Sequence, residues 1–163
     1  MAGYGTDEGF AAWLSANGYA LPVGAPSAAV LRRRGSVYID AAYGARFVGR
    51  PTDGFAQERQ WPRTGAMVHG QTIPDNVVPN AVVNASYEAA YQEAVSPGSL
   101  TAVGSTAARV KREKVEGAVE VEYQSTFGSK TLAEDMTPII TTIDGLLAPY
   151  LGPSGAIPGI LVV

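Results

Sequence analysis

Apolar and polar positions near the start of the chain follow the pattern of a short amphipathic helix. Thr6 is a residue type that caps helices, and the two acids after it suit the positive end of the helix dipole. Gly18 is placed to end the element. The apolar face comprises Phe10, Trp13 and Leu14. We therefore expect a helix that begins after Thr6 and stops before Gly18.

A second helix is predicted from Ser27, another capping residue, to Gly44. Apolar or small residues at helical spacing mark its buried face: Leu31, Gly35, Tyr38 and Ala42. The remaining positions are polar, and we expect them to face water or a partner: Arg32, Arg33, Ser36 and Asp40.

The stretch from Arg46 to Asp75 is interrupted by glycine and proline, which argues against a long helix or strand. Three aromatic side chains are large enough to hold this loop on the helices: Phe47, Phe55 and Trp61. We expect Trp61 to be the buried anchor, with Pro62 fixing the chain beside it.

The clearest helical pattern begins at Pro79 and continues to about Ala94, before Ser96, Pro97 and Gly98 stop it. One face of this helix comprises Val78, Ala81, Val82, Ala85 and Ala89. A fourth helix is predicted to start at Thr137 and Pro138 and to end near Leu151. Its apolar positions are Ile139, Ile143, Leu146, Leu147 and Tyr150.

Residues 110–123 have the alternation of a β-hairpin around Glu116 and Gly117. Opposite charges on the two arms would pair across the ladder and offer a contact surface: Lys111, Arg112 and Lys114 against Glu120 and Glu122. The fold class predicted from all these elements is mainly α, a small bundle of about four helices with one β-hairpin and an extended C-terminal tail. Residues 1–151 form the helical domain in this interpretation, and residues 152–163 form an apolar arm.

Composition restricts the possible functions of this domain. The 163 residues are 46% hydrophobic and 17% charged, as in one globular domain, and they include no cysteine, which excludes thiol chemistry. The net charge is −3, whereas nucleic-acid-binding domains usually have a basic excess. The sequence shows neither a signal peptide nor a membrane span, so we expect synthesis in the cytoplasm.

No motif in the sequence supports catalysis, a cofactor or a metal. Gly3 to Gly9 lacks the third glycine and the preceding strand of a dinucleotide loop, and no phosphate-binding loop is present. His69 is the only histidine, and its loop position favours a surface residue over a metal ligand. We expect that the protein is not an enzyme.

Two clusters of basic residues leave two interpretations open. The run Arg32 to Arg34 and the group around Lys111 could bind phosphates beside aromatic side chains, as single-strand binders do. A surface facing water or a partner protein is the other interpretation, and the acidic net charge favours it. The apolar end of the chain is a further candidate contact, because exposed apolar residues cost solubility unless a partner covers them.

Several blocks taken together resemble a family of phage proteins. The blocks are Tyr38 to Asp40 with Tyr43 and Gly44, Gln57 to Gly65, Ile73 with Pro74, Val78 with Pro79, and Val110 to Val115 followed by Val119 to Tyr123. They are similar to the head-tail connector proteins of long-tailed bacteriophages, and to sequences labelled DnaT-like single-stranded DNA-binding proteins. The resemblance covers roughly residues 28–151.

The resemblance implies a structural virion protein at the head-tail junction of the particle. Such an adaptor forms a ring, twelvefold in this interpretation, under the portal and continues the DNA channel to the next neck component without specific DNA binding. Its C-terminal end grips the portal, which places this role on Pro153, Ile157, Pro158, Ile160, Leu161, Val162 and Val163. A DnaT-like single-stranded DNA-binding protein is the alternative.

Overall fold

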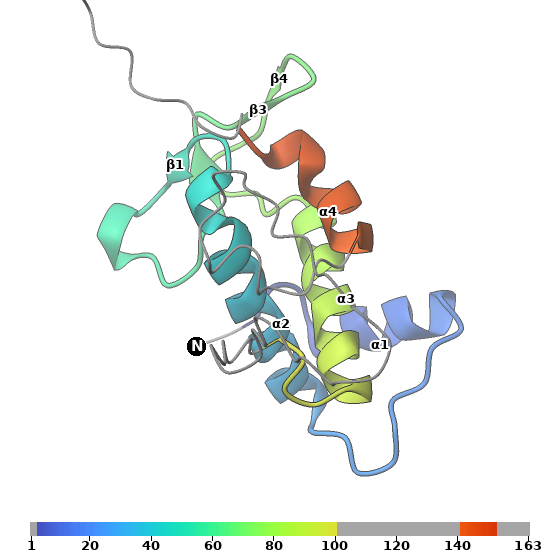
Figure 1. Ribbon diagram of the computed structural model, residues 1–163. Helices are drawn as coiled ribbons and strands as arrows, with labels where there is room; N and C mark the ends of the chain where they lie inside the picture. Colours follow the sequence, from blue (N-terminus) through green and yellow to red (C-terminus); the bar gives the residue numbers. More distant parts are fainter. Residues whose placement is uncertain (1–2, 101–140, 153–163) are drawn as a thin grey trace, which may run out of the picture.

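The structure is a computed structural model that describes residues 3–100 and 141–152 (Figure 1). Four α-helices dominate it: α1 (Asp7–Ala16), α2 (Ala28–Tyr43), α3 (Asn80–Val95) and α4 (Thr141–Leu147). The predicted class of a small, mainly α bundle is confirmed. The hairpin predicted at 110–123, the start of the fourth helix and the C-terminal arm lie outside the described residues.

The cap of α1 forms as the sequence predicts. The Thr6 hydroxyl accepts a hydrogen bond from the Gly9 amide at 2.9 Å, and the helix ends at Ala16 with Asn17 as its C-cap. Gly18 follows with a φ of 69°, in the left-handed region that favours glycine. Phe10 and Leu14 are buried, so this helix presents its predicted face to the bundle.

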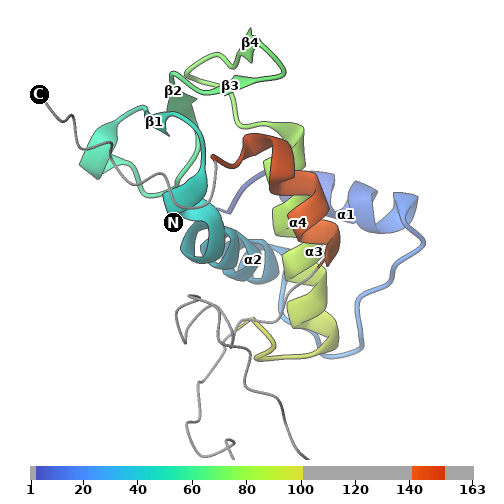
Figure 2. The ribbon, with the colours of Figure 1, turned by 45° about the horizontal axis from the view of Figure 1, so that its top comes forward.

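Helices α2 and α3 cross in close contact at the centre of the molecule, and α4 packs on α3 (Figures 1 and 2). Gly35 makes the crossing possible, because a β-carbon there would lie 2.3 Å from the Ser86 carbonyl oxygen and 2.7 Å from the Ala90 amide nitrogen. Ala85 and Ala89 of α3 are fully buried. The small residues expected on these faces therefore bring the two backbones together.

The segment between α2 and α3 contains only short elements, as predicted. They are η1 (Gly44–Arg46), β1 (Arg50–Pro51), η2 (Gly54–Ala56), β2 (Arg63–Thr64), β3 (Met67–Val68) and β4 (Gln71–Thr72). Strand β1 pairs antiparallel with β2, and β3 pairs antiparallel with β4. The bridge between Phe47 and Leu151 joins this segment to the end of η4 (Ala148–Tyr150).

Trp61 is the largest of the fully buried side chains, with 1% of its surface exposed. Its ring packs edge-on against Phe47 and Tyr150, with centroid separations of 5.7 and 6.1 Å. The central loop and the end of η4 therefore meet at one aromatic cluster. Pro62, which follows a cis peptide bond, is half-buried beside it.

Several sequence expectations about exposure are wrong. Phe55 is 105% exposed, because η2 turns its side chain to solvent and the loop is held instead by Phe47, Trp61 and a buried arginine, Arg63. Ala42 is exposed as well. Ser36 is buried, because its hydroxyl donates to the Arg32 carbonyl at 2.7 Å and accepts from the Tyr4 amide at 2.8 Å.

Replacement of the aromatic anchor tests this packing. We expect Trp61→Ala to lower the free energy of unfolding by about 3 to 5 kcal/mol, the usual cost of truncating a large buried aromatic residue. Trp61→Phe should cost less, because among the described residues the indole Nε1 has no hydrogen-bond acceptor to lose. Phe55→Ala is the matched control and should leave denaturant midpoints unchanged. Equal losses from Trp61→Ala and Phe55→Ala would contradict the assignment.

The helix crossing gives a second prediction. Gly35→Ala should destabilise the protein by about 1 to 3 kcal/mol, because the added methyl group overlaps the α3 backbone. Gly145→Ala in α4 is the control, since its β-carbon would enter open space. That change should stabilise by roughly 0.5 to 1 kcal/mol through lower chain entropy. Thermal unfolding of both variants measures the difference, and a neutral Gly35→Ala would refute the close crossing.

Candidate functional site

The arginine run at 32–34, predicted as a contact surface, divides into three environments. Arg32 is 9% exposed, which corrects the expectation that it faces water or a partner. Its Nε donates to the Asp7 carboxylate at 2.7 Å. Its Nη1 donates to the carbonyl oxygens of Gly5 at 2.7 Å and Tyr4 at 3.0 Å. Arg32 is thus a structural residue that holds the N-terminal segment on α2.

The two following arginines lie at the surface. Arg33 is exposed, and Arg34 donates to the Glu93 carboxylate of α3 at 2.9 Å. Glu93 is buried, and its second oxygen accepts from the Gly98 amide at 3.0 Å. The pair therefore neutralises a buried carboxylate and fixes the turn after α3. Within residues 3–100 and 141–152, Arg33 is the one arginine of this run that forms no ion pair.

A second polar group joins the N-terminal segment, α2 and the central loop. Asp40 accepts from the Tyr4 hydroxyl at 2.5 Å and pairs with Arg59 at 3.1 Å. The Tyr4 oxygen accepts in turn from the Trp61 amide at 3.2 Å. Burial, and then the nearby Asp40 carboxylate, raise the pKa of Tyr4 far above its ordinary value. Tyr4 therefore stays neutral, and the network is structural.

Arg63 holds the central loop together by hydrogen bonds to its backbone. Its guanidinium donates to the carbonyl oxygens of Val48 at 2.9 Å and Gly49 at 2.7 Å. Its carbon Cζ lies 6.0 Å from the centroid of the Phe47 ring. Burial lowers the pKa of Arg63. This cation binds backbone within the molecule and is not presented to a ligand.

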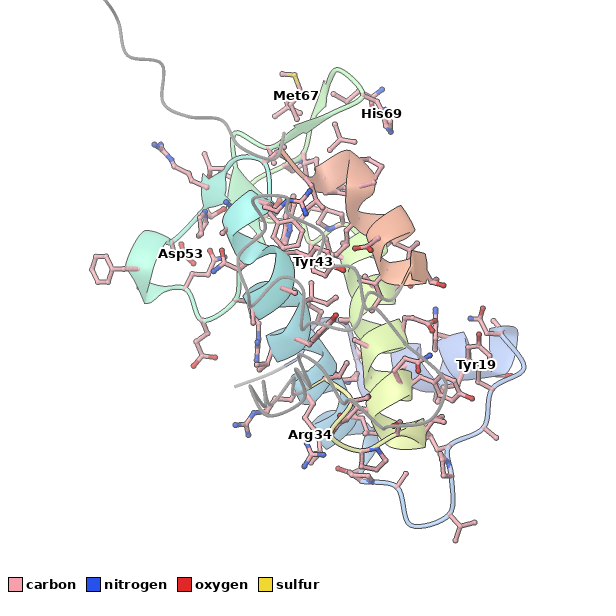
Figure 3. The ribbon with its side chains drawn as sticks, in the orientation of Figure 1. Tyr19, Arg34, Tyr43, Asp53, Met67 and His69 are labelled. Atoms are coloured by element: carbon pink, nitrogen blue, oxygen red, sulfur yellow. The ribbon has the colours of Figure 1, made fainter. Side chains whose placement is uncertain are left out.

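Tyr43 connects α2 to α4 (Figure 3). Its hydroxyl donates to the Asp144 carboxylate at 2.6 Å. Burial raises the pKa of Tyr43, and so does the hydrogen bond to Asp144. This contact ties the described end of the chain to the second helix, and Ile143 and Leu147 of α4 are fully buried around it.

A surface groove of about 1110 Å³ runs along α2 to the turn after α3. Its apolar wall includes Val30, Val37, Ala41 and Ala42, and its far side is formed by Pro97, Gly98 and Leu100. Arg33 and Arg34 border it. The sequence placed these arginines on a contact face, but the groove itself was missed, because its second wall comes from a turn about sixty residues later.

An aromatic stack lies where α1 and the residues after it meet α3. The rings of Tyr19 and Tyr91 are 4.3 Å apart and inclined by 3°, and Trp13 packs against Tyr19 at 5.6 Å. Tyr19 is partly exposed at the edge of the molecule (Figure 3). Neither residues 1–31 nor α3 contains a lysine or arginine, so no cation from these segments adjoins the stack.

The family model described as "Putative DnaT-like ssDNA binding protein" matches residues 3–162, nearly the whole chain. The chain belongs to this family. No curated protein and no solved structure matches it. The DnaT-like alternative from the sequence agrees with the family description, whereas the head-tail connector stays a prediction.

His69 is exposed on the β3–β4 hairpin (Figure 3), and residues 3–100 and 141–152 contain no acid, histidine or cysteine cluster that could hold a metal. No helix in these ranges is long and apolar enough to cross a membrane.

The remaining predicted site residues lie outside the described part of the chain. They are Lys111, Arg112, Lys114, Glu120 and Glu122 of the expected hairpin, and Pro153, Ile157, Pro158, Ile160, Leu161, Val162 and Val163 of the expected portal-docking arm. Their roles stay predictions.

The contrast between neighbouring arginines is testable. We expect Arg32→Ala to reduce the free energy of unfolding by about 1.5 to 3 kcal/mol, because it leaves buried carbonyl oxygens without a charged donor. Arg33→Ala should change it by less than about 0.5 kcal/mol, as for other surface substitutions. Urea titration of the two variants makes the comparison, and the reverse order would overturn the assignment of Arg32 to the fold.

Proposed function

We propose that this member of the DnaT-like family is a structural subunit of a tailed bacteriophage, an adaptor that forms a ring under the portal and continues the DNA channel. In this role it is not an enzyme and needs neither cofactor nor metal. Its partners are the portal, neighbouring adaptor subunits and the next neck component. DNA passes through the channel without specific binding.

The observation that supports this proposal best is the internal use of the arginines. Arg32, Arg59 and Arg63 are mostly buried and bind carboxylates or backbone carbonyls of the same chain. DNA binding depends on surface cations that neutralise phosphates and so release the counterions condensed on DNA, and these three mostly buried side chains are not available for that. The exposed arginines of the described residues are Arg33, Arg34, Arg46 and Arg50. The three mostly buried ones add no phosphate contact, which suits a channel wall along which DNA slides.

The exposed apolar side chains of the connecting loops also support an assembly role. Val23, Phe55 and Met67 lie on three separate segments and are at least half-exposed. A subunit with neighbours on several sides can cover such residues, whereas an isolated monomer leaves them in water. Portal docking is assigned, from the sequence alone, to the apolar arm at residues 152–163.

Particle assembly tests the adaptor proposal. Deletion of residues 153–163 should leave the helical circular dichroism signal and the melting temperature nearly unchanged, while the truncated subunit is lost from portal-bearing heads. Cryo-electron microscopy of particles with the full-length chain should place a ring containing the α2–α3 pair below the portal. Necks that lack this density would reject the proposal.

Binding of single-stranded DNA is the second candidate function. The family description favours it, and so does the partly exposed stack of Tyr19 on Tyr91, because bases can stack on aromatic rings. The lack of cations on the segments that form this stack argues against it.

Fluorescence anisotropy with a labelled oligothymidine distinguishes the two candidates. At physiological salt we expect no submicromolar binding by the full-length chain, and no change in the weak signal for Tyr19→Ala. Submicromolar affinity that falls steeply with salt and is lost in Tyr19→Ala would establish the DNA-binding candidate instead.

A further inference from the structure

We infer that copies of this chain associate head to tail, with the Phe55 loop of one copy seated in the α2 groove of the next. This inference deepens the proposed function and rests on it in one respect, since it names the surfaces by which adaptor subunits would contact one another. The contact itself follows from the shape and charge of two surfaces within residues 3–100.

The first surface is an apolar tip on an ordered loop. Phe55 lies in the η2 turn with its side chain fully in solvent. The base of the loop is held by Gln57, whose side-chain nitrogen Nε2 donates to the carbonyl oxygens of Arg59 at 2.7 Å and Pro62 at 2.9 Å. A loop fixed before binding loses little freedom on binding, so this tip is prepared for a contact.

The second surface is the groove along α2. Val30 and Val37 line it and are 41% and 46% exposed, which leaves an apolar strip between them and the turn after α3. At about 1110 Å³ the groove is larger than one aromatic ring requires, so it can also take the backbone of the turn that presents the ring. An aromatic anchor in an apolar pocket is the usual centre of a protein interface.

Charge favours this pairing of surfaces. Asp53 and Glu58 are exposed on either side of Phe55, so the tip is bordered by acids. Arg33 and Arg34 border the groove, and because Arg34 is paired with Glu93, the one acid among the described lining residues, Arg33 supplies the net positive charge there. An acid-bordered tip and an arginine-bordered groove attract each other and set the orientation of the contact.

The positions of the two surfaces make the contact intermolecular. Figure 3 shows Asp53 on a loop that projects from one side of the molecule, whereas Arg34 lies in the N-terminal half of α2, away from that loop. The contact joins unlike surfaces, so each copy keeps a free tip and a free groove after one contact has formed. Contacts of this type generate closed rings when the rotation between copies closes, as a neck adaptor requires.

Paired variants of the full-length chain test the inference by sedimentation velocity. Phe55→Asp destroys the tip and Val37→Asp destroys the groove, so each variant alone should remain monomeric at concentrations where the wild type assembles. A mixture of the two should form a one-to-one dimer and stop there, because only one intact tip and one intact groove can meet. Val23→Asp and Met67→Asp, which alter exposed apolar residues elsewhere, should still assemble.

A charge exchange examines the same contact. Arg33→Glu should weaken self-association at least about tenfold, the effect of a modest loss of complementarity. Adding Asp53→Lys and Glu58→Lys to that variant should restore it. Failure of the restored variant to assemble would assign the effect of Arg33 to another contact.

Three results would overturn the inference. They are a wild type that stays monomeric at all concentrations, a mixture that does not dimerise, and a Val37→Asp variant whose melting temperature falls sharply, as it would if residues of the same chain filled the groove. Imaging separates this failure from that of the proposed function. A neck ring without the Phe55 contact keeps the adaptor role, whereas tip-and-groove assembly by a protein absent from necks rejects that role alone.

Discussion

At Gly35 the backbones of α2 and α3 approach so closely that a side chain would overlap the Ser86 carbonyl. The rest of the described domain is arranged around this contact, because α2 has three faces and each has a different neighbour. One face packs on α3 through Gly35 and Ile39, and another holds the N-terminal segment and the central loop. The last lines the groove with Val30 and Val37. A single helix therefore serves as core, scaffold and surface.

The polar face of α2 explains where sequence reasoning was right and where it failed. Helix positions and the crossing residues could be predicted, because apolar spacing, the Thr6 cap and glycine have local physical causes. Ser27, the other predicted cap, makes no side-chain cap hydrogen bond. Arg32, Ser36 and Asp40 follow one another at intervals of four, a pattern typical of a solvated face. They are covered instead by Tyr4 and Arg59, and only the fold brings those residues near.

Contact surfaces were harder to predict than the core for the same reason. The exposed position of Arg33 followed from its place on the helix, yet the groove beside it needs the turn at Pro97 and Gly98, which is distant in sequence. Phe55 was expected in the core because aromatic residues usually gain most from burial. Whether such a residue faces inward depends on the turn that presents it, and no periodicity in a loop reveals that.

The internal placement of charge has a consequence for function. Each arginine that holds a loop through carbonyl oxygens has its hydrogen-bond donors engaged within the chain, so it is not free to bind the phosphates of a polyanion. Arg63 shows this well, since its guanidinium binds three backbone oxygens of the loop that begins at Phe47 and ends at Gly49. Rigid loops of this kind keep their exposed tips in fixed positions, and fixed positions are what a repeating assembly needs. The same arginines thus order the fold, and in the proposed adaptor role recognition is left to protein contacts.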